Sequence, residues 1–287
     1  KNCPKEYMIT IMRRCMYRIS KEILAQLSDM YKKIRNTARF MLGNLSNKSG
    51  FDPDKDSIPV SELHEIDKWA LLRLNQLIEK VKAAYEAMDY YLAYHVINSF
   101  CVVDMSNFYL DIIKDRLYCE AAEGEDRRAA QTAMYIILSG LTRLIAPIIT
   151  FTADEIWKEL PKKSGDDARN VVFNRMPEAT GISVDTAKWD KIHAIRDDVL
   201  VALEQKRNEK VIGKSLEAKV ILHTNDDLSD ILPVLNKAFI VSQVELAYSL
   251  LLLPRQFYGT TLPCFCLYPL EKTGIARCMP DILLFSH

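Results

Sequence analysis

The stretch KKIRNTARFMLGNL, residues 32–45, has a helical pattern in which polar and apolar side chains fall on two different faces. Positions three and four apart share one face of a helix, because each residue turns the chain by about 100°. The polar face carries Lys32, Asn36, Arg39 and Gly43. The opposite face is an apolar stripe made up of Ile23, Leu27, Tyr31, Ile34, Ala38, Met41 and Leu45. The pattern predicts a helix over residues 20–45 that packs on its apolar stripe and leaves its polar stripe free for water or a ligand.

The helical period continues almost without interruption to residue 161. It predicts a second helix that ends near residue 88, a third over residues 91–119 and a fourth that stops before Pro147. Ser20 is placed to cap the first helix, and Thr152 with Glu155 forms a capping-box pattern for a short fifth helix. Long helices joined by short links favour an antiparallel helix bundle over residues 20–161. We expect its core to contain the aromatic residues Trp69, Tyr85, Phe108, Tyr135 and Trp157.

The composition changes after residue 161. Residues 162–184 are rich in turn formers and read as a linker arm, with VVF at residues 171–173 as a short strand candidate. Asp185 then caps an amphipathic helix, and alternating strand patterns on either side of a second helical segment predict a small α/β unit over residues 185–246. Neither the lead-in, residues 1–19, nor the tail, residues 247–287, has a sustained period. The fold class is therefore mainly α, with a bundle followed by a small α/β unit.

Composition limits the classes of function. The 287 residues include 38 basic and 38 acidic side chains, so any nucleic-acid surface must be a local patch. The nine glycines argue against a glycine-lined nucleotide site. Seven cysteines without a paired C-x-x-C motif are typical of a reduced, cytoplasmic protein. The longest apolar run is far shorter than the roughly 20 residues of a membrane span, so we expect no membrane partner.

No catalytic or metal site emerges from the pattern. The five histidines are scattered, and Cys264 with Cys266 forms only a C-x-C that Cys278 follows at a distance, so zinc is disfavoured and no cofactor is expected. Asp104, Asp111 and Asp115 could form an acidic stripe, but basic side chains lie in the same turns, so ordinary ion pairing is the favoured interpretation. Cys101 lies in an apolar stretch and is expected to pack in the core.

Two basic segments remain as candidate binding residues. Both could neutralise phosphate, and asparagine and arginine could also read the edge of an unstacked base, so RNA is a chemically adequate ligand. On pattern alone the favoured alternative is a solvated helix face. The first segment consists of Lys32, Lys33, Arg35, Asn36 and Arg39. The second surrounds the turn at Gly213 and consists of Lys206, Arg207, Lys210 and Lys214.

Four blocks of the sequence resemble a known family. They are residues 31–45 (YKKIRNTARFMLGNL), 94–119 (YHVINSFCVVDMSNFYLDIIKDRLYC), 127–161 (RRAAQTAMYIILSGLTRLIAPIITFTADEIWKELP) and 206–220 (KRNEKVIGKSLEAKV). In this order they are similar to the C-terminal, anticodon-binding region of bacterial isoleucine–tRNA ligase, a class I aminoacyl-tRNA synthetase. The resemblance extends over about residues 18–246. The valine enzyme shares the last two blocks in looser form, and NFYLDIIKDRLYC favours the isoleucine enzyme.

The resemblance implies a partner and a missing part. The bundle would bind the anticodon of isoleucine tRNA, and the α/β unit would form a junction against the tRNA, with no role for DNA. The HIGH and KMSKS signatures that bind ATP in class I ligases are absent, so the chain is expected to be inactive alone, with ATP and magnesium used by the absent catalytic domain. Residues 247–287 depart from the family pattern. We expect a monomer, and the alternative function is a helical protein-interaction scaffold or the equivalent region of the valine enzyme.

Overall fold

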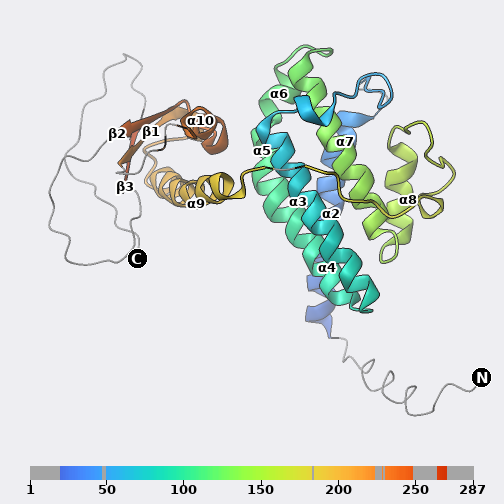
Figure 1. The fold of residues 1–287 in the computed structure, drawn as a ribbon. Coiled ribbons are helices and arrows are strands. Elements are labelled where there is room, and N and C mark those ends of the chain that lie inside the picture. The colour runs from blue at the N-terminus through green and yellow to red at the C-terminus, as the bar shows by residue number, and fades with distance from the viewer. Residues whose placement is uncertain are drawn as a thin grey trace, which may run out of the picture. The chain divides into compact units, whose positions relative to one another are not determined.

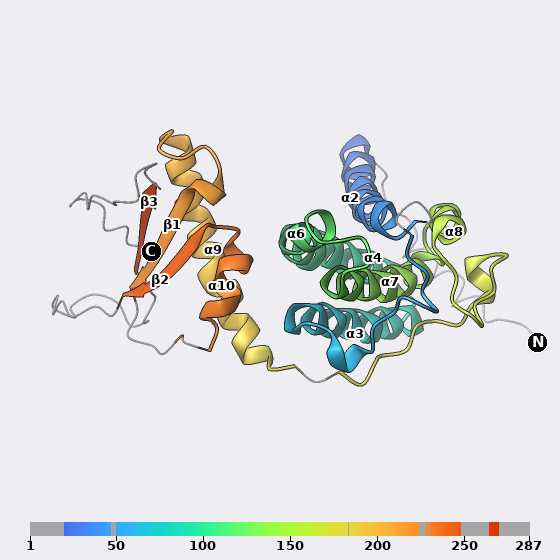
Figure 2. The same cartoon turned by 90° about the horizontal axis from the view of Figure 1, so that it is seen from above.

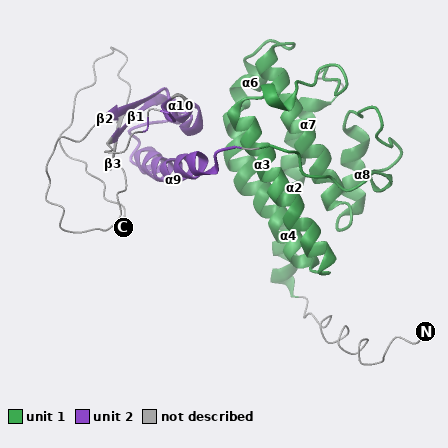
Figure 3. Ribbon diagram, viewed as in Figure 1, with its two compact units in different colours: residues 1–182 green, residues 183–287 purple. Residues whose placement is uncertain are grey.

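The computed structural model describes residues 20–46, 50–182, 184–223, 228, 230–247 and 264–269. The chain divides into two compact units, residues 1–182 and residues 183–287 (Figures 1 and 3). The first is a helix bundle and the second a small α/β unit, so the predicted mainly α fold class is confirmed. The lead-in, residues 1–19, lies outside the described residues, as does most of the tail.

The bundle contains most of the helical elements of the described residues. Viewed along the helices, α7 lies in the middle, and α2, α3, α4 and α8 pack around it (Figure 2). Most residues of α7 are buried for this reason. The helical elements are α2 (Lys21–Leu45), η2 (Val60–Glu62), α3 (Glu65–Glu86), α4 (Tyr90–Ser99), η3 (Phe100–Tyr109), α5 (Leu110–Ile112), α6 (Lys114–Tyr118), α7 (Glu125–Ile145), α8 (Thr150–Glu159) and η4 (Val171–Phe173).

Helix α2 follows the predicted pattern only in part. Ser20 caps it as expected, since its Oγ accepts a hydrogen bond from the Ile23 amide at 3.3 Å. The C-terminal half of the apolar stripe, from Ile34 onward, is buried in the bundle. The prediction is wrong for the first turns, because Ile23 and Leu27 are 43% and 42% exposed. The described bundle therefore covers the apolar stripe only from Ile34 to Leu45 and leaves its first turns exposed.

The predicted aromatic core is present. Trp69 and Phe108 are buried and meet edge to face with ring centroids 4.8 Å apart, a geometry that aromatic pairs favour. Tyr135 and Trp157 are also buried. Tyr85 is only half-buried, and its hydroxyl donates to the Leu144 carbonyl of α7 at 2.5 Å. The prediction is confirmed for four of the five aromatics and is too strong for Tyr85.

The predicted third helix is not one regular α-helix. Between α4 and α5 the backbone is π-helical over η3, and a further break at Ile113 separates α5 from α6. The wider π-helical turn brings Ser106 to 2.9 Å from the Thr37 hydroxyl of α2, while Thr37 also donates to the Cys101 carbonyl. The break at Ile113 leaves the five residues of α6 as a separate element.

Two local predictions are wrong. Thr152 does not cap α8, which begins at Thr150, because its hydroxyl is bonded to Tyr31 of α2 at 3.1 Å. The VVF segment forms the 3₁₀ turn η4 instead of a strand, since the Asn170 side chain accepts from the Val172 amide and caps the turn. Residues 162–182 cluster with the bundle, to which the side chain of Asn75 fastens them through Thr180.

In its described residues the second unit contains a three-stranded sheet, two α-helices and a short 3₁₀ helix. Strand β1 lies in the centre, parallel to β2 and antiparallel to β3. Asp185 caps the long helix as predicted, by accepting hydrogen bonds from the Ala187 and Lys188 amides. Strand β3 was not predicted, and it extends the sheet beyond residue 246. The elements are α9 (Thr186–Asn208), η5 (Ser215–Glu217), β1 (Ala218–His223), α10 (Leu232–Phe239), β2 (Gln243–Ala247) and β3 (Cys264–Pro269).

Candidate nucleic-acid interface

The polar stripe of α2 is exposed along its whole length. Lys32, Asn36, Arg39 and Gly43 all face solvent, as the helical period predicted. Within the described ranges, no hydrogen bond or ion pair engages the side chain of Asn36 or Arg39. Their hydrogen-bond donors, and the amide oxygen of Asn36, therefore have no partner in the described bundle.

The remaining predicted residues of α2 have local partners. Lys33 forms an ion pair with Asp29 one turn earlier, at 2.9 Å, and this hydrogen bond lowers the pKa of the Asp29 carboxyl. Arg35 donates a long hydrogen bond of 3.4 Å to the Tyr31 hydroxyl. Both basic side chains are exposed, so they contribute positive charge beside the stripe.

A shallow hollow of about 370 Å³ lies against this stripe. Asn36 and Arg39 line it together with Gly43, and Tyr118 of α6 also contributes to the lining. The Tyr118 side chain is 63% exposed, so its ring stands largely clear of the core. Phe40 and Asn44 complete the lining. The hollow thus combines an arginine, an amide, an exposed aromatic ring and a helical glycine.

Gly43 leaves one wall of the hollow open. A Cβ added at this position would meet no protein atom within 4 Å, so packing inside the described bundle does not require glycine there. Glycine inside a helix is unfavourable relative to alanine, and it is used where a ligand must approach the backbone closely. The glycine is consistent with a surface that something else contacts.

Helix α6 is held in place by a buried ion pair. The Arg116 guanidinium donates two hydrogen bonds to the carboxylate of Asp67, at 3.0 and 2.8 Å, and two more to the main-chain carbonyl of Asp126. Asp67 is fully buried and also accepts from the Tyr109 hydroxyl at 2.8 Å. Burial, reinforced by the Asp67 charge, raises the pKa of Tyr109 well above its usual value.

The second predicted basic segment differs from the expectation in one residue. Lys206 is buried and forms an ion pair with Glu209 at 2.7 Å, because it continues the inward face of α9 three residues after Leu203. Arg207 is exposed but pairs with Glu204. Of the four predicted residues, only Lys210 and Lys214 present charge at the turn without an ion pair among the described residues.

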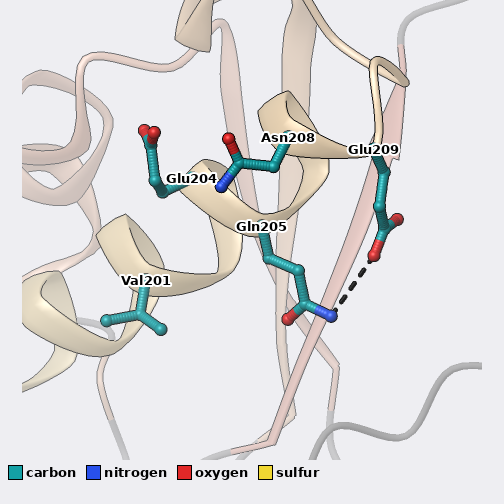
Figure 4. A pocket seen from close by; sticks show the side chains of 5 residues that line it. All are labelled: Val201, Glu204, Gln205, Asn208 and Glu209. Carbon is teal, nitrogen blue, oxygen red and sulfur yellow. Dashed lines mark hydrogen bonds between the residues drawn. The ribbon is translucent and has the colours of Figure 1, made fainter.

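A second hollow on α9 has the wrong charge for an anion. Its volume is about 520 Å³, and its lining comes from α9 and its C-cap: Val201, Glu204, Gln205, Asn208 and Glu209 (Figure 4). Two carboxylates stand at its rim, and Gln205 donates to one of them, Glu209, at 3.2 Å. Carboxylates repel phosphate, so the hollow beside α2, which has no acidic lining, is the better candidate for RNA.

The described residues show no cluster suited to metal binding. No group of three or more His, Cys, Asp or Glu side chains within the described ranges is arranged to hold a metal ion. Asp104 and Asp111 form ion pairs with Arg73 and Lys114, as expected. Cys101 is buried, and burial raises the pKa of its thiol to about 12. The side chains of Cys264, Cys266 and Cys278 lie outside the described residues, so the expected absence of zinc stays a prediction.

A comparison with protein families decides what kind of domain this is. The sequence profile of the "Anticodon-binding domain of tRNA ligase" matches residues 67–222, more than half of the chain. The chain belongs to this family. The matched range begins in the first turn of α3 and ends in β1. Tyr118 lies inside this range, and α2 precedes it.

Curated relatives carry the name isoleucine–tRNA ligase. The chain is 48% identical to the isoleucine–tRNA ligase of Bacillus mycoides strain KBAB4 over 236 residues. The aligned region covers 80% of this chain and 25% of the relative. The chain is 50% identical over 240 residues to that of Caldicellulosiruptor bescii, with 81% and 26% covered. The chain therefore spans about a quarter of the length of the curated relatives it matches. In the described part of this anticodon-binding domain, no helix is long and apolar enough to span a membrane.

Tyr118 is the lining residue that comes from outside α2, and sequence reasoning missed it, as it missed Phe40 and Asn44. It lies 75 positions after Gly43 along the chain, and only the tertiary fold brings the two residues to one hollow. Its one signal in the sequence is a large aromatic side chain directly after the apolar Leu117, where a solvated position is expected to be polar. That signal alone does not indicate a partner on α2.

Proposed function

We propose that this chain binds the anticodon arm of a tRNA, and that an unstacked base enters the hollow between α2 and α6. The observation that carries the proposal is the lining of that hollow, which places the unpaired side chains of Asn36 and Arg39 together with the exposed ring of Tyr118. Aromatic rings stack on single-stranded bases, and arginine and asparagine supply phosphate and base-edge contacts. Membership of the anticodon-binding family supports the same ligand.

The proposed tRNA is the isoleucine acceptor. Support comes from the printed names of the relatives, which are 48% and 50% identical to this chain, although each is about four times as long as the matched region. In that setting the chain supplies tRNA recognition to a longer cytoplasmic ligase, and the attachment of isoleucine with ATP takes place on a part that these residues do not include. We expect the isolated chain to be a monomer that does not bind DNA.

The salt dependence of binding tests the proposal. Phosphate contacts release counterions, so log affinity falls linearly with log salt, by about 0.7–0.9 units for each neutralised phosphate. We expect the 287-residue chain to bind an isoleucine tRNA transcript with such a negative slope, measured by fluorescence anisotropy between about 50 and 200 mM salt. A chain that shows no binding above that of a carrier protein at low salt would contradict the proposal.

One observation favours the alternative of a protein-interaction scaffold. Large apolar side chains are exposed on the first turns of α2 and around the α3–α4 turn, among them Leu24 at 54%, Met88 at 73% and Tyr91 at 72%. Exposed apolar surface of this kind marks protein contacts. Sedimentation of the chain distinguishes the two functions, because association that depends on these side chains and not on tRNA would favour the scaffold.

A further inference from the structure

The placement of Tyr118 needs an explanation, because its own packing does not fix it. The side chain is 63% exposed, and α6, which it terminates, has only five residues. A helix of this length is not stable by itself, because few hydrogen bonds offset the cost of ordering its backbone. The direction of the Tyr118 ring must therefore come from whatever holds α6.

Two kinds of contact hold α6 to the bundle. Ile113 and Leu117 are buried, which anchors the segment by apolar packing. Apolar packing is non-directional and sets the rotation of a short helix only weakly. Arg116 adds a directional contact, since its planar guanidinium is forked onto Asp67 of α3 and also donates through Nε and Nη2 to the Asp126 carbonyl at the start of α7.

The ion pair is poorly explained by stability alone. The Asp67 side chain is 0% exposed and that of Arg116 is 11% exposed, so both charges have lost most of their hydration. Replacement of a buried ion pair by apolar residues of similar volume is often neutral or stabilising, and the best-supported reason to keep such a pair is conformational specificity. Two parallel hydrogen bonds from a guanidinium to one carboxylate fix both the distance and the rotation of the helix that carries the arginine.

We infer that Arg116 is a positioning residue, which acts through its fork on Asp67 to hold the Tyr118 ring as a fixed wall of the hollow. Arg116 precedes Tyr118 by two positions, so the two side chains leave α6 in nearly opposite directions, one inward and one outward. A fixed wall lowers the entropy cost of base stacking, because the ring does not have to be ordered when RNA binds. The inference rests on the proposed function, since it assigns a role within the same hollow.

The test removes the ion pair without leaving a buried charge. The double variant Asp67→Leu/Arg116→Met keeps similar volumes, and Arg116→Lys, which keeps the charge but cannot form the fork, serves if the double variant does not fold. The matched control is Arg73→Met/Asp104→Leu, which removes another forked arginine–aspartate pair, with distances of 2.9 and 3.3 Å, from the α3–η3 contact. Neither control residue lines the hollow.

Two measurements are made on the full chain. Amide hydrogen exchange at Leu117, Tyr118 and Cys119 is expected to quicken by about tenfold or more in the ion-pair variant and to stay unchanged in the control. Affinity for the isoleucine tRNA transcript is expected to fall by at least about fivefold, because stacking on one ring is worth about 1–3 kcal/mol. In a Tyr118→Ala background the ion-pair variant is expected to cause no further loss, since the ring through which it acts is gone.

Other outcomes would overturn the inference. If the losses from the ion-pair variant and from Tyr118→Ala multiply, the pair supports the structure in general and does not act through the ring. If the variant leaves both affinity and α6 exchange unchanged, the pair positions nothing. If the unaltered chain binds no tRNA, the proposed function fails, and hydrogen exchange alone then decides whether the pair holds α6.

Discussion

Phe108 packs η3 against α3 through its contact with Trp69. It is 2% exposed, and its ring meets Trp69 edge to face. Phe108→Ala is expected to lower the free energy of unfolding by about 3–5 kcal/mol, because it removes the transfer energy of the ring and leaves a cavity. Urea titration followed by Trp fluorescence measures the change. A loss below about 1 kcal/mol would show that this face of η3 is not packed as described.

Lys32 and Asn36 stand one turn apart on the same stripe but are expected to act differently. Lys32→Ala, if the lysine meets phosphate, lowers affinity for every tRNA alike and reduces the salt slope by about one unit. Asn36→Ala, if the amide reads a base edge, reduces discrimination between isoleucine tRNA and an anticodon-altered transcript by about 1–3 kcal/mol. Both changes lie on the exposed face of α2, so thermal unfolding is expected to stay nearly constant. Equal effects of the two variants on both tRNAs would contradict the assignment.

Gly43 offers a test in which stability and binding change in opposite directions. Gly43→Ala is expected to stabilise the chain by up to about 1 kcal/mol, because alanine is the better helix former. It is also expected to weaken tRNA binding, because the methyl group enters space at the wall of the hollow.

The matched control is Gly140→Ala in α7, where the added Cβ would meet Leu74 side-chain atoms at an ordinary contact distance of 3.5 Å. This variant is expected to be as stable as the unaltered chain or more so, with tRNA affinity unchanged. Weaker binding in the Gly140 variant, or unchanged binding in the Gly43 variant, would argue against RNA in the hollow.

At the scale of elements, the contact between α3 and α7 is expected to weaken in alkali. The pKa of Tyr85 is raised from an ordinary value of 10.0 to about 12. Burial is the main cause, and the nearby Tyr90 adds a smaller effect. Above pH 10 the unfolded chain therefore releases this proton while the native chain keeps it, so stability falls between about pH 10 and pH 12. Below pH 10 Tyr85 has no such effect, because its hydroxyl is protonated in both states.

Denaturation at several pH values measures this contribution. Tyr85→Phe is expected to show a smaller loss of stability between pH 10 and 12 than the unaltered chain, although part of the loss remains because burial also raises the pKa of Tyr109 and Tyr135. Tyr118→Phe, at an exposed position, serves as the control. Parallel stability profiles for the unaltered chain and the Tyr85 variant would contradict the assigned role of burial.

The elements that local rules govern were predictable from the sequence. Ser20 and Asp185 cap the helices expected of them, because an N-cap depends on a side chain and the amides two or three residues later. The buried position of Lys206 was also readable, since it continues the inward spacing of Val199 and Leu203. In that case the charge of the residue was given more weight than the period.

The elements that non-local contacts govern were not predictable. Thr152 has the pattern of a cap, yet its hydroxyl is taken by Tyr31, which is 121 positions away in the sequence. In the π-helical segment η3 the buried side chains recur every four positions, as at Phe100, Asp104 and Phe108, and this spacing also occurs in an α-helix, so periodicity does not distinguish the two. The same reason applies to the site: the period of α2 predicted the exposed stripe, but the chain gives no local signal that Tyr118 shares a hollow with it.

At the scale of the whole molecule, the chain consists of a bundle and a small α/β unit. It matches about a quarter of the length of the isoleucine–tRNA ligases to which it is similar. The formal net charge is zero, so long-range attraction does not explain nucleic-acid binding. In the proposed function recognition is therefore local, at the exposed stripe of α2 and the ring of Tyr118. This is why variants at the hollow, and not changes in overall charge, are expected to alter the choice of tRNA.

The most direct test of the central claim is a paired titration of the 287-residue chain with an isoleucine tRNA transcript and with the same transcript carrying an altered anticodon, at one salt concentration. We predict that the altered transcript binds about 5- to 150-fold more weakly, which corresponds to the loss of about 1–3 kcal/mol for one base contact. We also predict that Tyr118→Ala brings the two affinities closer together. Equal affinity of the unaltered chain for both transcripts would contradict the account.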